Sequence, residues 1–211
     1  MKKIELAMLI GMVIAVFSAG LCGASENRGK ITDTVFRLHI LANSDSEEDQ
    51  QLKLEVRDAV LAECSYLFED CGDADESART AEENMEMIKE TAERVIDENG
   101  STYNVECEVT EMHFDKRIYD SVTIPAGNYK ALRITIGEAE GKNWWCVMFP
   151  PLCIPVATGG LEDYDDIFTA EEIEMLNNPD DYECKLYILE LIDKLKKHFD
   201  VQFVENANEN L

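Results

Sequence analysis

Cysteine and histidine are the residues of this sequence that could carry out covalent chemistry. A cysteine nucleophile needs a neighbouring histidine as its base, and the chain has seven cysteines but only three histidines, His39, His113 and His198. His39 has the most suitable context, because Asp45 and Asp49 follow it and a carboxylate could orient its ring. No motif places a cysteine beside any histidine, so the sequence predicts no catalytic residue.

The spacing of potential ligands does not favour a metal or a cofactor. There is no His-Glu-x-x-His or Cys-x-x-Cys pattern, and Cys146 and Cys153 stand further apart than the cysteines of a zinc knuckle. Gly159-Gly160 lacks the pattern of a phosphate-binding loop and indicates a turn. We therefore expect neither a metal nor a cofactor.

The charge of the chain excludes one class of partner. The formal net charge is −25, which repels the phosphates of nucleic acids and anionic lipid headgroups. The hydrophobic share of 45% is that of a globular protein and not of a disordered acidic tail. We expect no nucleic-acid binding, and a membrane contact only through the N-terminus.

The N-terminus has the order of a secretory signal peptide. Lys2 and Lys3 precede an uncharged apolar run from Leu6 to Phe17, and small residues follow up to Ala24. The run is shorter than the roughly 20 apolar residues of a membrane span. The sequence predicts export, with residues 1–24 as a signal peptide or an uncleaved anchor.

An exported chain meets an oxidising compartment, where cysteines can pair. Cys146 and Cys153 are the best pair, because the Pro150-Pro151 corner can bring them within the ~4.4 to 6.8 Å between Cα atoms that a disulfide requires. The remaining cysteines of the exported part have two open interpretations, further disulfides or buried thiols. They are Cys64, Cys71, Cys107 and Cys184.

The hydrophobic spacing predicts the elements that must position these residues. Alternation predicts strands at residues 35–41, 103–110, 132–136 and 143–149, and helical spacing predicts helices after Ser46, after Asp75, at 169–176 and at 182–199. Arg37 and His39 fall on the polar side of the first strand, which we expect to face solvent. The glycines at 137 and 141 predict a hairpin between the last two strands. The order favours an α+β fold: a single two-layer domain, with helices on one face of an antiparallel sheet.

The segment NWWCVMFPPLC, residues 143–153, is the best candidate for a binding surface. Adjacent strand residues point to opposite faces, so Trp144 and Trp145 cannot enter the same core. A rigid corner could hold apolar side chains out for a partner. The alternative interpretation is that helices cover both faces of the sheet and bury the whole segment, with Pro150-Pro151 ending the strand. The candidate contacts are Trp144, Trp145, Phe149, Pro150, Pro151 and Leu152, with the loop residues Asn43, Ser44 and Asp45.

Two long stretches of the sequence resemble a known family. They are FRLHILANSDSEEDQQLKLEVRDAVL at residues 36–61 and IPAGNYKALRITIGEAEGKNWWCVMFPPLC at residues 124–153, and both are similar to stage II sporulation protein R of endospore-forming bacteria. The resemblance spans a core domain at residues 31–155. Residues 156–211, an acidic segment and a C-terminal helix expected to pack on the core, match nothing that we can name.

The resemblance implies a signalling protein and not an enzyme. Members of this family are exported from the forespore into the space between the forespore and mother-cell membranes. There they trigger a membrane-embedded aspartic peptidase, from its extracytoplasmic face, to process pro-sigma-E in the mother cell. Two alternatives remain, a secreted cell-envelope hydrolase that uses a cysteine with His39, and a structural module that binds the envelope.

Overall fold

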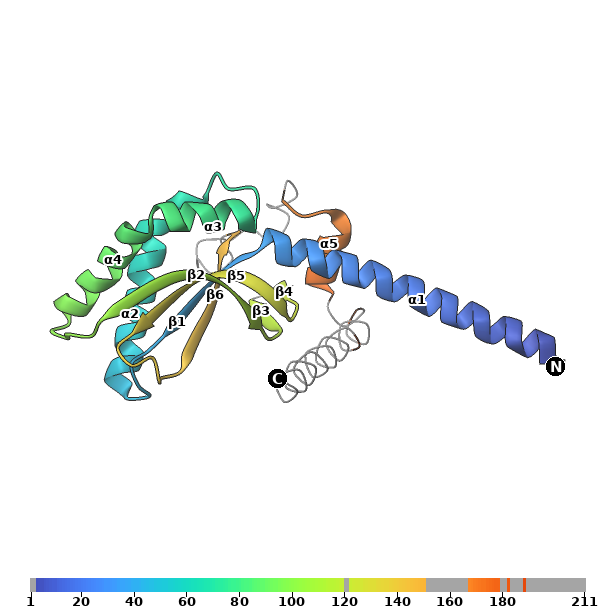
Figure 1. Cartoon of the computed structure of the whole chain (residues 1–211), viewed down its shortest axis with the longest axis horizontal. Coiled ribbons are helices and arrows are strands. Elements are labelled where there is room, and N and C mark those ends of the chain that lie inside the picture. Colours follow the sequence, from blue (N-terminus) through green and yellow to red (C-terminus); the bar gives the residue numbers. More distant parts are fainter. Residues whose placement is uncertain (1–2, 120–121, 151–166, 179–181, 183–187, 189–211) are drawn as a thin grey trace, which may run out of the picture.

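A four-stranded sheet forms the centre of the protein in a computed structural model, which describes residues 3–119, 122–150, 167–178, 182 and 188 (Figure 1). The sheet order is β2-β5-β1-β6. β1 runs parallel to β5 and antiparallel to β6, while β2 is antiparallel to β5. The predicted α+β fold with a mostly antiparallel sheet is confirmed. The strands are β1 (Phe36–Leu41), β2 (Val105–Phe114), β5 (Gly127–Ile136) and β6 (Asn143–Phe149).

The predicted hairpin between the last two strands is wrong, because β1 lies between β5 and β6. The connection at residues 137–142 instead crosses the end of β1. There the amides of Glu140 and Gly141 donate to the carbonyls of Asn43 and Ala42, at 3.1 and 3.0 Å. A Cβ at Gly141 would collide with the carbonyl of Ser44, so only glycine allows this close crossing. The two glycines marked a turn correctly, but not which strands it joins.

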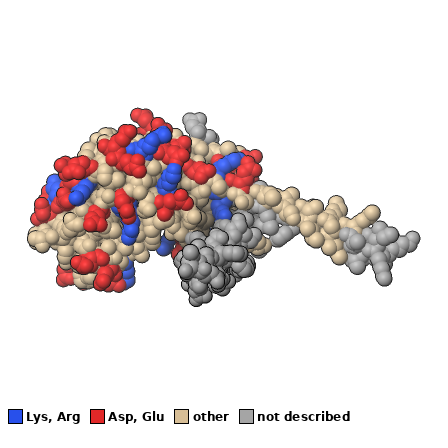
Figure 2. Space-filling view, viewed as in Figure 1, with Lys and Arg blue, Asp and Glu red and all other residues tan. Residues whose placement is uncertain are grey.

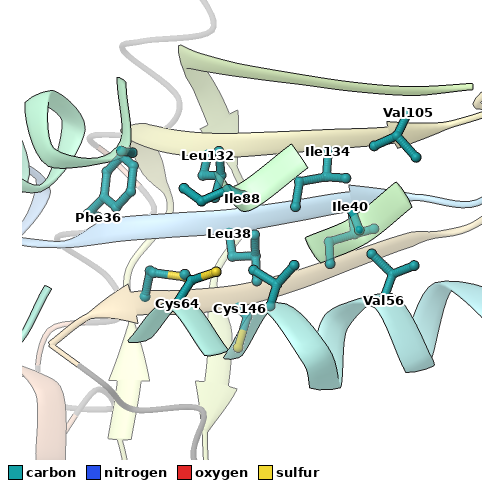
Figure 3. Packing of buried hydrophobic residues seen from close by; sticks show 14 of the residues in the cluster. Phe36, Leu38, Ile40, Val56, Cys64, Ile88, Val105, Leu132, Ile134 and Cys146 are labelled. Carbon is teal, nitrogen blue, oxygen red and sulfur yellow. The ribbon is translucent and has the colours of Figure 1, made fainter. Parts of the chain in front are cut away.

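Helices α2 (Glu47–Cys64), α3 (Ala74–Glu83) and α4 (Met85–Glu98), with the 3-10 turn η1 (Ser65–Phe68), cover one face of the sheet (Figure 1). Ser46 caps α2 by accepting a hydrogen bond from the Asp49 amide at 3.1 Å, as the sequence predicts. The single helix expected after Asp75 is two helices that meet at Asn84. Their apolar sides pack on alternate residues of the strands (Figure 3). This core includes Phe36, Leu38, Ile40, Val56, Ile88, Leu132, Ile134 and Cys146.

The opposite face carries a second apolar cluster. It is formed by the C-terminal end of α1 (Lys3–Thr34), α5 (Ala170–Asn177) and a small two-stranded sheet of β3 (Arg117–Tyr119) and β4 (Val122–Ile124). The short helix predicted at residues 169–176 is confirmed as α5, with Thr169 and Glu172 in a capping box. The cluster includes Ile31, Val35, Phe114, Ile124, Tyr129, Val147, Phe168 and Leu176.

Helix α1 continues beyond the predicted leader at residue 24 and ends at Thr34. Its N-terminal part projects away from the sheet, whereas Ile31 is fully buried near its end (Figure 1). Among the described residues, none of the helices has the length and apolar character that a membrane span requires. The division at residue 24 stays a prediction, and the helix predicted at residues 182–199 lies outside the described part apart from two isolated positions.

Candidate functional site

Arg37 and His39 are buried in the middle of the sheet. Arg37 is 0% exposed and His39 is 2% exposed, so the expected solvent face of this strand is wrong. Alternation placed both residues correctly on the side opposite to Phe36 and Leu38. They are nevertheless covered, because β1 is a central strand and distant segments fold over its second face. Buried polar groups in such a position require partners, which makes this face the candidate site.

The Arg37 guanidinium lies within a group of aromatic rings. Its Cζ atom is 4.1 Å from the centre of the Phe114 ring, 5.1 Å from that of Tyr129 and 5.8 Å from that of Tyr119. Nη2 donates to the Tyr119 hydroxyl at 2.5 Å, but Nε and Nη1 are buried without a hydrogen-bond partner. Burial lowers the pKa of Arg37. Ring faces attract the cation, and no carboxylate in the described part forms an ion pair with it.

His39 stacks on Trp145 with ring centres 3.9 Å apart and an angle of 6° between the planes. Its Nε2 hydrogen-bonds the Asn143 side-chain oxygen at 2.7 Å. An amide oxygen only accepts, so Nε2 carries the proton and the buried, unpartnered Nδ1 is the bare nitrogen of the neutral ring. Burial lowers the pKa of His39, which keeps the ring neutral near pH 7.

Trp145 connects these two buried groups. Its ring meets Phe114 edge to face at 4.8 Å, and its carbonyl accepts from the Tyr119 hydroxyl at 3.4 Å. The side chain remains half-buried and is therefore accessible in part. We call the connected set of side chains on this face the aromatic strip. It consists of Arg37, His39, Phe114, Tyr119, Tyr129, Asn143 and Trp145.

Trp144 points to the helix-covered face, so the prediction that the two tryptophans take opposite faces is confirmed. The Arg57 guanidinium lies 4.4 Å from the centre of its ring. Phe149 is buried, so the expectation that the corner holds this side chain out for a partner is wrong, and the receptor candidate Pro150 is buried as well. Phe149 sits in the core because β6 stays paired with β1 up to Phe36. Pro151 and Leu152 lie outside the described residues.

The loop residues that were predicted to contact a receptor, Asn43, Ser44 and Asp45, form hydrogen bonds within the protein. The Asp49 carboxylate accepts from Ser44 Oγ at 2.5 Å and from Asn43 Nδ2 at 2.9 Å, and these bonds lower the pKa of Asp49. Asn43 also accepts from the Glu138 amide at 3.0 Å, and Asp45 accepts from the Lys142 amide at 2.8 Å. The loop therefore ties the start of α2 to the crossing connection. Its role as a receptor contact stays a prediction.

Two of the described cysteines, Cys64 and Cys107, are poorly placed for catalysis with His39. Cys64 and Cys107 belong to the helix-covered face, opposite to the histidine. Burial raises the pKa of the Cys64 thiol and raises that of Cys107 to about 12, so neither forms a thiolate near pH 7. This placement argues against the hydrolase interpretation.

The predicted bridge between Cys146 and Cys153 stays a prediction, because Cys153 lies outside the described residues. Cys146 itself is buried in β6. A peptide mass map of exported protein tests the bridge: we expect one linked peptide that contains both cysteines. Recovery of both as alkylated thiols from unreduced protein would contradict it.

Sequence reasoning missed the three rings around Arg37. Tyr119 lies in β3, which is three residues long, and Phe114 ends a strand that runs beyond the predicted residue 110. Tyr129 shares the side of β5 that carries Ala131 and Arg133, and extending the alternation back from Leu132 could have found it.

The protein is thus a single α+β domain whose sheet has one apolar, helix-covered face and one face bearing the aromatic strip. The sequence model of the stage II sporulation protein R family matches residues 32–158. Stage II sporulation protein R of Bacillus subtilis (strain 168) is 37% identical over 147 residues, which are 69% of this chain and 66% of that protein. The match thus spans just under two thirds of the relative. No solved structure matches the chain significantly. The chain belongs to the stage II sporulation protein R family, and this membership supports a role in sporulation.

Proposed function

We propose that this protein is an exported signal of endospore formation. After export from the forespore, it triggers the membrane-embedded aspartic peptidase that processes pro-sigma-E in the mother cell. The observation that carries the proposal is the family match over residues 32–158, because this span includes every strand of the sheet. The apolar run of the N-terminal segment supports export of the chain.

The receptor supplies the chemistry in this proposal, and the protein supplies binding free energy. Binding activates a peptidase only if the protein binds its active form more tightly than its inactive form. The half-buried Trp145 is the first contact candidate, because its ring is preorganised by the stack on His39 and by Phe114.

Co-expression in a non-sporulating host tests the function. The full chain, a chain without residues 1–24 and a chain with residues 1–24 replaced by an unrelated secretion signal are each produced with the cognate peptidase and pro-sigma-E. Truncation after Ala24 retains the end of α1 and its buried Ile31, so the sheet domain keeps its second cluster. We expect pro-sigma-E shortening with the first and third chains only.

The proposal would be contradicted if pro-sigma-E is not shortened although the full chain, the peptidase and pro-sigma-E are all present and folded. Retention of the protein on purified cell wall in the same host, without any shortening, would favour an envelope-binding module instead. Shortening with the leaderless chain confined to the cytoplasm would contradict the need for export.

A further inference from the structure

Strand β2 forms one margin of the sheet over ten residues, Val105–Phe114. Its pairing with β5 is continuous from Val105 opposite Ile136 to Phe114 opposite Gly127, without a bulge. Helices α3 and α4 pack against the face of this strand, and in the described part no further strand follows it at the edge. One long side of β2 is therefore left without a pairing strand.

The register identifies which backbone groups point outward. The Gly137 amide donates to the Asn104 carbonyl at 2.9 Å, so this pair is hydrogen-bonded in the ladder. Hydrogen-bonded pairs alternate along an antiparallel ladder, so the even-numbered residues of β2 bond to β5. The amides and carbonyls of the odd-numbered residues point outward, and none of them bonds to another described backbone group. These residues are Val105, Cys107, Val109, Glu111 and His113.

A long regular edge is a template for adding a strand, and soluble proteins block it with bulges, prolines, short edge strands or charged side chains. β2 has no bulge or proline and is ten residues long, so its only protection is charge: the exposed carboxylates of Glu106, Glu108 and Glu111, which repel an acidic strand but not a basic one. Acidic side chains are also spread over the visible surface of the domain (Figure 2). Pairing of two copies through this edge would bring these carboxylates together in a chain of net charge −25, which disfavours a second copy as the occupant.

Charge complementarity points to a cationic partner. Glu108 is already paired with Arg133 at 3.0 Å, whereas Glu106 and Glu111 make no ion pair with a described residue. A strand laid along the edge would receive main-chain hydrogen bonds from the odd-numbered residues. Its Lys or Arg side chains would lie opposite the two unpaired carboxylates, in the favourable cross-strand arrangement of opposite charges.

We propose that the outer edge of β2 binds an extended, basic segment from the extracytoplasmic part of the receptor peptidase, which adds a fifth strand to the sheet. This proposal rests on the proposed function. It adds a second receptor contact to the one proposed for Trp145, which lies in β6 at the other margin of the sheet, and it assigns the affinity of this second contact to backbone groups that the sequence pattern alone does not reveal.

Proline substitution isolates the backbone contribution. Glu111→Pro removes one outward amide and places a ring where the added strand would lie, without losing a hydrogen bond to β5. Glu111→Gln removes the same carboxylate but keeps the outward backbone N–H, so it is the matched control. Both variants are compared with the wild type in the co-expression assay, after circular dichroism and a thermal melt have shown that each is folded.

We expect at least a tenfold loss of pro-sigma-E shortening for Glu111→Pro and a loss of no more than about threefold for Glu111→Gln, since one hydrogen bond plus a steric block is worth over 1.4 kcal/mol. Equal activity of the folded proline and glutamine variants would overturn edge binding. If Glu111→Pro does not fold, the double variant Glu106→Lys with Glu111→Lys tests the proposal instead, because it reverses the charge of the edge. We expect at least a tenfold loss of pro-sigma-E shortening for this variant, and wild-type activity would overturn the proposal.

The outcomes separate this proposal from the function. Failure of the wild type to promote shortening contradicts the function itself, whereas an active wild type with an equally active Glu111→Pro contradicts only the edge. Sedimentation tests self-pairing: a wild-type dimer that Glu111→Pro dissociates would assign the edge to a second copy and overturn the receptor proposal.

Discussion

Arg37 and Leu38 are neighbours in β1 and both are fully buried, on opposite faces of the sheet. Leu38 lies among aliphatic and aromatic side chains under the helices. Arg37 is surrounded by three aromatic rings and keeps two nitrogen atoms without a hydrogen-bond partner. Most of the buried side-chain nitrogens without a partner in the described part thus lie on the face with the aromatic strip, whereas the helix-covered face has one, Nε1 of Trp144.

The two faces also differ in the hydrogen bonds that they provide to a buried ionisable group. Asp49, next to the helix-covered face, is 7% exposed and accepts hydrogen bonds from Asn43 and Ser44. Arg37 has one hydrogen bond, to a neutral hydroxyl. Burial of an ion costs several kcal/mol, against about 2 kcal/mol for cation–π contacts and about 1 kcal/mol for a hydrogen bond. We therefore expect that the buried charge of Arg37 lowers the free energy of unfolding.

Truncation of Leu38 should have the largest effect on stability. Leu38→Ala leaves a cavity in a fully buried position, and we expect a loss of about 3 kcal/mol in the free energy of unfolding. Arg37→Met, the matched change on the other face, should be at least as stable as the wild type, because an unpaired buried charge is replaced by an apolar chain of similar length. Urea denaturation compares the three proteins. A loss above about 2 kcal/mol for Arg37→Met would contradict the contrast between the faces.

The Asp49 carboxylate should have an intermediate effect that depends on pH. Its pKa is held below the ordinary value by the bonds from Ser44 and Asn43, so its contribution is present above about pH 4 and is lost as pH falls through the folded-state pKa. Asp49→Asn should cost about 1–2 kcal/mol at pH 7. Its stability curve should approach that of the wild type as the pH falls below the folded-state pKa of Asp49. Parallel curves between pH 7 and pH 2 would show that the carboxylate charge is not involved.

The smallest effect is expected when the folded protein is treated with an alkylating reagent, because we expect no labelling of the thiols on the helix-covered face. Cys64 and Cys107 are held by burial as neutral thiols, so iodoacetamide at pH 8 should leave both unmodified in the folded protein. Mass spectrometry after unfolding in guanidinium should find both alkylated, which controls for reagent activity. Rapid labelling of either thiol in the folded protein would reopen the interpretation of a cysteine nucleophile.

The sequence predicts which face a residue takes better than it predicts exposure. Alternation placed Arg37, His39 and the two tryptophans on their correct sides, because the strand period is a local property. It could not predict that Arg37 is covered, since Tyr119 approaches it from 82 positions further along the chain. The same limit explains the hairpin: the glycines at 137 and 141 fix a turn locally, but the insertion of β1 between β5 and β6 is decided by long-range pairing.

The candidate site was predicted only in part for a similar reason. Trp144 and Trp145 stood out by composition, but Phe149 looked accessible because a Pro-Pro corner follows it, and its burial depends on pairing with Phe36. The loop from Asn43 to Asp45 was identified as a turn, while its bonds to Glu138 and Lys142 depend on a connection almost a hundred residues away.

A pairwise test of the two tryptophans addresses most directly the claim that the face with the aromatic strip is the signalling face. Trp144→Ala and Trp145→Ala both remove a half-buried indole from β6, on opposite faces of the sheet. Each is compared with the wild type for pro-sigma-E shortening by the co-expressed peptidase, with a thermal melt to confirm folding. We predict that folded Trp145→Ala abolishes shortening while folded Trp144→Ala retains it. Normal activation by folded Trp145→Ala would contradict the account.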